Sequence, residues 1–253
     1  MPEPLVFLPG MMSDARLFGP QIGALSSETA IMAAPITRGE RIEEIASSLL
    51  DVLPARFALA GACMGGAVAM EIVRRAPDRV TRLALISTNA LADTPQEAAA
   101  REPQIVRVRA GRLAEVMDEA LPPDALAPGP AQRHVRELKR EMAVSLGPET
   151  FVRQSRALQR RRDQQRMLSQ SRMPILVMCG VHDPIRPVKR QRVMAELIPD
   201  AELCVLDKSG HVPTLEQPEA ATKALRGWMQ RPLMLHADFC SNEKEGRSAT
   251  VRP

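Results

Sequence analysis

The segment Gly61-Ala62-Cys63-Met64-Gly65-Gly66 decides the fold of this chain. It follows an apolar stretch typical of a strand, 57–60, and precedes a stretch that favours a helix, 67–75. A strand that turns sharply into a helix around Gly-x-nucleophile-x-Gly holds one side chain out at the tip of the turn. Gly61 and Gly65 tolerate such a strained backbone and allow neighbouring segments to pack closely. Serine is the usual residue at the tip, and Cys63 occupies that position here.

Strand-like and helix-like segments alternate on both sides of this turn. Short apolar runs typical of strands occur at 5–8, 30–34, 57–60, 80–86, 174–179 and 201–206, and helical patterns occur at 42–53, 67–75 and 218–229. Continuous apolar strands separated by helices indicate a parallel sheet covered on both faces. The sequence therefore predicts an α/β fold with a mostly parallel sheet of about six strands flanked by helices.

The stretch 92–170 interrupts the alternation. It has helical patterns, a proline-rich break at 121–130 and no convincing strand signal. We interpret it as a helical lid inserted before the last two strands, above the C-terminal edge of the sheet. The remaining core is expected at 1–91 and 171–231. Residues 232–253 are polar and without pattern, which predicts a flexible tail in which His236 and Cys240 are incidental.

Three chemically reactive side chains follow strand-like segments. Cys63 follows 57–60, Asp183 follows 174–179 in Gly180-Val181-His182-Asp183-Pro184, and His211 follows 201–206 in Ser209-Gly210-His211-Val212-Pro213. Open α/β sheets place their sites at the carboxyl ends of the strands. The order nucleophile, acid, histidine therefore predicts a Cys-His-Asp triad, with the backbone N–H groups of Met11 and Met64 as oxyanion donors.

These motifs resemble the α/β-hydrolase superfamily, and the resemblance covers about residues 4–231. Besides the turn and the two loops, it includes Leu8-Pro9-Gly10-Met11, where many members have His-Gly, and Ala76-Pro77-Asp78-Arg79-Val80 after the turn helix. Dienelactone hydrolases of this superfamily are similar in using a Cys-His-Asp site. Polyhydroxyalkanoate synthases also have a cysteine at this turn but are much longer.

The helix N-terminus and an adjacent imidazolium favour the thiolate of Cys63, so an ion pair with His211 is expected. The leading hypothesis is a hydrolase of an ester, thioester or lactone with a small to medium, partly apolar acyl group. It acts through an acyl-cysteine intermediate. Two alternatives stay open: an acyltransferase or cyclase on the same fold, and a non-catalytic ligand-binding or sensor protein.

Other residues have competing interpretations. Cys63 itself is compatible with a small buried hydrophobe in a degenerate family member. Met12 and His134 are candidate pocket-lining residues, whereas His182 is expected to be a surface residue. The run 160–162 of three arginines is typical of a solvated face. Cys179 and Cys204 lie inside strand-like segments, where an inert buried thiol is expected.

Composition narrows the function class further. The 253-residue chain has a formal charge of only +4, no Tyr and one Trp, which argues against nucleic-acid binding. There is no dinucleotide fingerprint and no His/Cys cluster at zinc spacing, so no cofactor or metal is implied. The longest uncharged run, 57–70, is too short to span a bilayer, and the N-terminus resembles no signal peptide. The sequence predicts a cytoplasmic protein whose partner is a small acyl substrate. It leaves the oligomeric state open.

Overall fold

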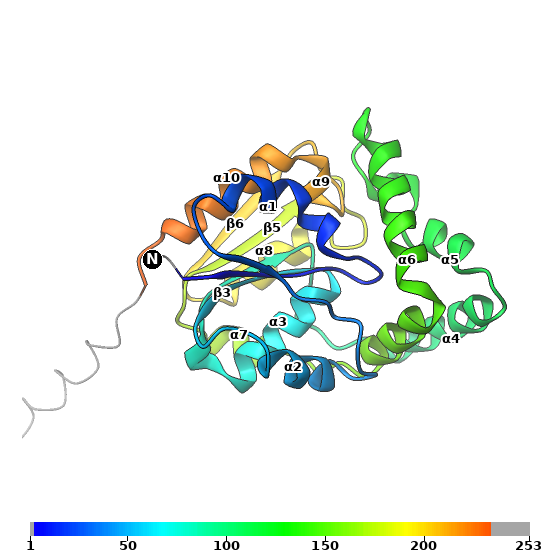
Figure 1. Cartoon of the computed structure of the whole chain (residues 1–253), viewed down its shortest axis with the longest axis horizontal. Coiled ribbons are helices and arrows are strands. Elements are labelled where there is room, and N and C mark those ends of the chain that lie inside the picture. Colours follow the sequence, from blue (N-terminus) through cyan, green and yellow to red (C-terminus); the bar gives the residue numbers. More distant parts are fainter. Residues whose placement is uncertain (1–2, 234–253) are drawn as a thin grey trace, which may run out of the picture.

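A computed structural model describes residues 3–233. Within that range the strands form one six-stranded sheet in the order β2-β1-β3-β4-β5-β6, and every neighbouring pair is parallel (Figure 1). The predicted α/β-hydrolase fold is therefore confirmed. The strands are β1 (Leu5–Leu8), β2 (Ile31–Ala33), β3 (Phe57–Ala62), β4 (Val80–Ile86), β5 (Ile175–Gly180) and β6 (Ala201–Leu206).

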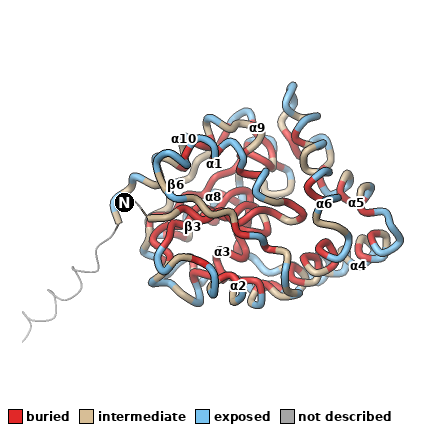
Figure 2. Tube along the Cα trace, viewed as in Figure 1, coloured by how far each residue is buried: buried red, intermediate tan, exposed pale blue. Residues whose placement is uncertain are grey.

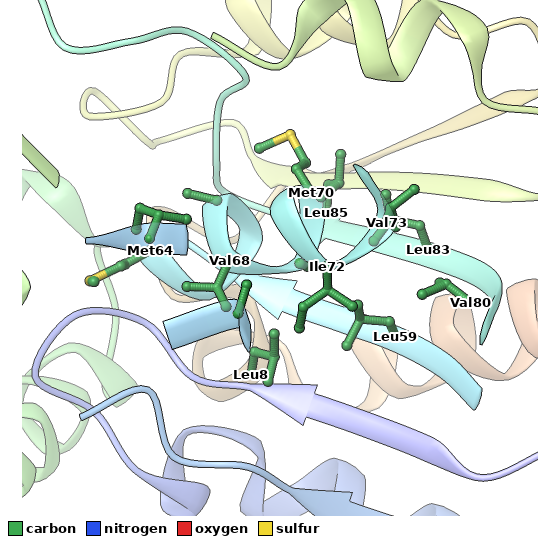
Figure 3. Packing of buried hydrophobic residues seen from close by; sticks show 14 of the residues in the cluster. Leu8, Leu59, Met64, Val68, Met70, Ile72, Val73, Val80, Leu83 and Leu85 are labelled. Carbon is green, nitrogen blue, oxygen red and sulfur yellow. The ribbon is translucent and has the colours of Figure 1, made fainter. Parts of the chain in front are cut away.

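Helices cover both faces of the sheet because successive strand side chains alternate between the two faces. In β1, Val6 and Leu8 pack into the cluster under α2, α3, α7 and α8, whereas Leu5 and Phe7 pack under α1 and α10. Figure 3 shows the first cluster, in which α3 lies against the neighbouring strands. These helices are α1 (Gly19–Leu25), α2 (Ile42–Leu50), α3 (Met64–Arg75), α7 (Gln165–Gln170), α8 (Val188–Glu196) and α10 (Pro218–Gln230).

The four central strands β1, β3, β4 and β5 are buried along their whole length, and Figure 2 shows them as the continuous red interior. Burial on both faces explains why these segments are runs of apolar residues rather than alternating ones. The edge strands β2 and β6 are only partly buried. Short segments complete the described chain: α9 (Pro213–Glu216) and the one-turn 3₁₀ helices η1 (Ala15–Phe18), η2 (Pro77–Arg79) and η3 (Pro123–Ala125).

The chain between β4 and β5 is helical, as the sequence predicts for 92–170. It contains α4 (Pro95–Arg109), α5 (Leu113–Ala120), α6 (Ala131–Gln159) and α7. Helix α6 is kinked at Gly147, whose φ of 75° leaves the helical region immediately before Pro148. In Figure 1, α4, α5 and α6 stand together beyond the carboxyl ends of the strands. They form their own apolar cluster, which includes Met12 from the loop after β1.

Most of the predicted tail, together with His236 and Cys240, lies outside the described residues. Within the part of the chain that the structure describes, none of the helices combines the length and apolar character needed to cross a bilayer.

Candidate active site

Cys63 occupies the tip of the turn between β3 and α3. Its backbone has φ 49° and ψ −111°, a strained conformation for a residue that is not glycine. The turn is held on both sides: the Cys63 N–H donates to the Ile86 carbonyl at 2.9 Å, and the Cys63 carbonyl accepts from Thr88 Oγ1 at 2.6 Å. The surrounding structure therefore fixes this residue with its side chain at the carboxyl edge of the sheet.

The two glycines of the turn are required by close backbone approaches. A Cβ added to Gly61 would lie 2.4 Å from the Gly65 carbonyl oxygen, and one added to Gly65 would lie 2.2 Å from the Leu8 carbonyl oxygen. Helix α3 can therefore begin directly against the end of β1. The register of the sheet agrees, because Leu8 pairs with Gly61. The loop after β1, with Met11, is thus brought beside the turn.

Asp183 and His211 meet across the ends of β5 and β6. Asp183 is buried, and its Oδ1 accepts from the backbone N–H groups of Ile185 and Arg186, both at 2.9 Å. Its Oδ2 lies 2.9 Å from Nδ1 of His211. The carboxylate is thus fixed by its own loop and in turn orients the imidazole.

The electrostatics couple Cys63 to His211. Burial raises the pKa of the Cys63 thiol, but the interaction with His211 and the charges of Arg186 and Lys139 outweigh it and lower that pKa to about 6. Burial likewise lowers the pKa of His211, but Asp183 and Cys63 together raise it to about 9. Between these values the favoured state is a thiolate–imidazolium pair. Burial raises the pKa of the Asp183 carboxyl, but the hydrogen bonds with His211 and with the backbone N–H groups together outweigh burial and hold that pKa below its usual value.

A buried glutamate that sequence reasoning missed shapes the loop that carries His211. The Glu216 carboxylate accepts from the backbone N–H groups of Gly210 at 2.9 Å, Val212 at 2.8 Å and Ala127 at 2.7 Å. The His211 N–H donates to the carbonyl of Ala125 at 2.7 Å. The helical insertion is therefore hydrogen-bonded directly to the histidine loop. A glutamate six residues after Gly210 gives no sequence signal for such a role.

One cavity of about 260 Å³ opens beside Cys63. Four predicted site residues line it, namely Cys63, His211, Met11 and Met64. Apolar side chains from the insertion form much of the remaining wall: Met117, Leu121, Phe151 and Leu158. The volume of the cavity lies just below the roughly 300–1,000 Å³ typical of small-molecule sites, which suits a small ligand.

Two predicted pocket residues are corrected by the structure. Met12 does not line this cavity: it is fully buried in the insertion's apolar cluster, and its N–H donates to Gln154 Oε1 at 2.8 Å. The positive φ of 50° at Met12 turns the chain away after Met11. His134 is exposed on α6 and does not line the cavity either. A helical pattern alone does not tell which face of α6 meets the sheet.

The arginine run at 160–162 is also not uniformly solvated. Arg160 and Arg162 are exposed, but Arg161 is buried, pairs with Asp93 at 2.8 Å and lines the cavity. Lys139, Arg101 and Arg186 line it as well, and sequence reasoning missed all three. Lys139 contacts Met11 and Ser13, which lie more than 120 positions earlier, so no local pattern marks it.

The remaining described cysteines differ from Cys63. Burial raises the pKa of Cys179 to about 12, so this thiol stays protonated and inert as predicted. Cys204 is only partly buried, and burial raises its pKa too. His182 is exposed, as expected. Among residues 3–233, no group of three or more His, Cys, Asp or Glu side chains is arranged to hold a metal ion.

Comparisons with known proteins agree with this architecture. The family model described as alpha/beta hydrolase fold matches residues 51–218. The chain is similar to a pimeloyl-[acyl-carrier protein] methyl ester esterase of Aromatoleum aromaticum, with 30% identity over 72% of this chain and 77% of the relative.

Two solved structures are similar over most of the chain. A thermophilic esterase from Thermogutta terrifontis, solved with malate bound, has a TM-score of 0.82 and 28% identity over 90% of this chain and 89% of its own. The enol-lactonase from Burkholderia xenovorans has a TM-score of 0.80 and 24% identity over 91% and 92%, and shows the fold alone. The matched family model and the relatives named as esterases lead to one conclusion: this chain belongs to the alpha/beta hydrolase fold family and is an enzyme of the α/β-hydrolase type.

Proposed function

We propose that this protein hydrolyses an ester, thioester or lactone through a Cys63-His211-Asp183 triad and an acyl-cysteine intermediate. One observation carries the proposal. The strained turn that presents Cys63 and the 2.9 Å pair of His211 with Asp183 converge on one cavity with a mostly apolar wall from the insertion. The low pKa of Cys63 supplies the nucleophile without a proton transfer at the moment of attack.

The reaction has two stages. The Cys63 thiolate attacks the acyl carbon, the bond from that carbon to the leaving group breaks, and the imidazolium of His211 gives its proton to the departing oxygen or sulfur. The acyl group is then a thioester on Cys63. His211, now neutral, takes a proton from water as its oxygen attacks the thioester. The carboxylic acid leaves, and the thiolate–imidazolium pair is restored.

Two backbone N–H groups are proposed to stabilise the oxyanion that forms in each stage. Met64 begins α3, where the N–H groups at a helix N-terminus have no partner within the helix. Met11 lies in the loop that the Leu8–Gly61 register brings beside the turn. Both residues line the cavity, which supports this assignment.

A soft thiolate nucleophile favours acyl groups with good leaving groups over amides. The proposal agrees with the relatives named as a methyl ester esterase and an esterase. We also propose that 92–170 acts as a lid and that 1–91 with 171–231 is the catalytic core, because helices of the insertion close the cavity over Cys63. A free catalytic thiolate suits a reducing compartment, so a cytoplasmic location is part of the proposal.

The test follows turnover and protein mass together for wild type and Cys63→Ala with a panel of acyl esters, thioesters and lactones. We expect wild-type turnover, its loss in Cys63→Ala, and retention in the matched control Cys204→Ala. Undiminished turnover by Cys63→Ala would overturn the mechanism. An acyl adduct on Cys63 that only a non-water acceptor releases would instead assign an acyltransferase. Tight small-molecule binding without adduct or turnover would assign a sensor.

A further inference from the structure

Four cationic side chains line the cavity beside Cys63. Arg101 comes from α4, Lys139 from α6, Arg161 from the segment just after α6 and Arg186 from the loop after β5. We call these four residues the basic wall. Among the described residues, no aspartate or glutamate lines the same cavity. The charge of this small, mostly buried space is therefore strongly one-sided.

The nearby carboxylates are already engaged and do not balance this charge. Asp93, which is 2% exposed, is shared between Arg101 at 2.9 Å and Arg161 at 2.8 Å, so one carboxylate serves two guanidinium groups. Glu97 accepts from the Thr94 N–H at 2.8 Å at the start of α4. Asp14 binds Arg16 at 2.7 Å.

Several donors of the basic wall lack a charged partner. Within residues 3–233, the buried Nε atoms of Arg161 and Arg186 have no hydrogen-bond partner. Among the residues that the structure describes, Lys139 Nζ contacts only neutral oxygens, the carbonyl of Met11 at 3.3 Å and Ser13 Oγ. Leaving buried cationic donors unpaired is costly, and an anion that entered the cavity would satisfy them.

The pKa shifts of the basic wall agree with buried cations that lack a counter-ion. Burial lowers the pKa of Lys139 to about 8 and also lowers the pKa of Arg161. Arg186 and Lys139 both act on the charge of Cys63, so they lie within electrostatic reach of the reacting centre. A single small molecule can therefore present an anionic group to the basic wall and its acyl carbon to the Cys63 thiolate.

We propose that the basic wall binds a carboxylate at the far end of the acyl group, so that the substrate is a monoester, monothioester or lactone of a dicarboxylic acid. Guanidinium groups match the planar fork of a carboxylate. The same cavity is lined by the apolar residues Met117, Leu121, Phe151 and Leu158, which suit a short methylene chain. This inference rests on the proposed hydrolysis at Cys63.

The test uses two matched substrates: the ethyl thioester of adipic acid, with a free carboxylate, and the ethyl thioester of adipamic acid, with an amide in its place. They have the same number of heavy atoms and differ in charge. We expect wild type to prefer the acid by about tenfold or more in kcat/KM, which is the effect of one charge-assisted hydrogen bond. Arg186→Gln and Lys139→Met should lower that preference about tenfold, chiefly through KM for the acid.

Controls separate recognition of the carboxylate from other effects. Arg186→Lys should keep most of the preference, and Arg190→Gln, an exposed arginine outside the cavity, should keep all of it. Loss of activity that is equal for both substrates, with a raised pH midpoint for alkylation of Cys63, would assign the basic wall to thiolate stabilisation and overturn the proposal. Inhibition by inorganic phosphate at lower concentration than by adipate would overturn the choice of a carboxylate.

A binding measurement keeps this proposal distinguishable from the hydrolase proposal. Calorimetric titration of Cys63→Ala with the ethyl thioesters of adipic acid and of adipamic acid requires no turnover, and only the first carries a carboxylate. Tighter binding of the adipic acid thioester that Arg186→Gln weakens supports the carboxylate site even if wild type hydrolyses neither thioester, in which case the hydrolase proposal alone fails. Hydrolysis of both thioesters by wild type at equal rates, with equal binding of the two by Cys63→Ala, would overturn the carboxylate site and leave the hydrolase proposal intact.

Discussion

The sheet edge and the insertion contribute to the same cavity in different ways. At the sheet edge, Cys63 is held by hydrogen bonds with Ile86 and Thr88 at the end of β4, and Asp183 is held by backbone N–H groups of its own loop. Asp183 in turn holds His211. On the insertion side, three residues of the basic wall come from α4, α6 and the segment after α6, whereas Arg186 follows β5. Within residues 3–233, the basic wall contains cationic donors without partners. We infer that the strand ends fix the chemistry, whereas the insertion selects the substrate. The predictions below test this division.

The largest effect is expected at the sheet edge. Asp183→Asn should lower kcat by about 10²–10⁴-fold, because an amide no longer holds the His211 imidazole in the required tautomer or stabilises its charge. Asp207→Asn changes an exposed aspartate in the loop before His211 and serves as the control. Steady-state kinetics of both variants check this prediction. Wild-type kcat in Asp183→Asn would remove this residue from the site.

The next effect concerns the charge state of Cys63. With a pKa of about 6, Cys63 is mostly thiolate at pH 7, about thirtyfold more so than a free thiol of pKa ~8.5. Alkylation by iodoacetamide should therefore rise with pH through a midpoint near 6. In the same way, kcat/KM should be high between about 6 and 9, where the thiolate and the imidazolium coexist. Peptide mass mapping identifies the alkylated site. An alkylation midpoint above pH 8 would contradict the ion pair.

A smaller effect is expected where the two regions join. Glu216→Gln replaces a carboxylate that accepts from the N–H groups of Gly210, Val212 and Ala127. It should lower the free energy of unfolding by about 1–3 kcal/mol, since a buried donor then loses its acceptor. Urea denaturation measures the change, with the exposed Glu219→Gln as the matched control. Equal stability of the two variants would show that Glu216 does not tie the insertion to the histidine loop.

The smallest effect is expected for His134→Ala. Because His134 is exposed on α6 and away from the cavity, kcat/KM should stay within about twofold and the free energy of unfolding within about 0.5 kcal/mol. Kinetics and urea denaturation test both values. A tenfold loss of kcat/KM would restore His134 as a pocket residue and contradict its placement on the exposed face of α6.

The same division explains what the sequence could predict. The strands, the turn at Cys63 and the loops of Asp183 and His211 are local features. Apolar runs mark the strands, and a glycine after the run marks the turn at Cys63 and the two loops. The structure contains every predicted strand, and the helix predicted at 42–53 ends only three residues earlier, at Leu50. These features depend on residues close in the chain, so a single sequence is enough to find them.

The basic wall depends instead on contacts between distant residues. A run of three arginines predicts a solvated face, and Arg161 is the exception within it. Its partner Asp93 lies 68 positions earlier in the chain. Lys139 is one of many charged residues on α6, so the sequence does not single it out. Its contact with Met11 becomes visible only when α6 is packed against the loop after β1. Composition and periodicity do not predict how the insertion packs on the sheet.

The central claim is that Cys63 forms a covalent acyl intermediate. The most direct measurement is the mass of the protein after rapid acid quench during turnover of an acyl thioester, followed by peptide mapping. The account predicts the mass increase of one acyl group, located on the peptide that contains Cys63 and absent from Cys63→Ala, which should also lose turnover. An acyl group on a different residue, or turnover by Cys63→Ala at the wild-type rate, would contradict it.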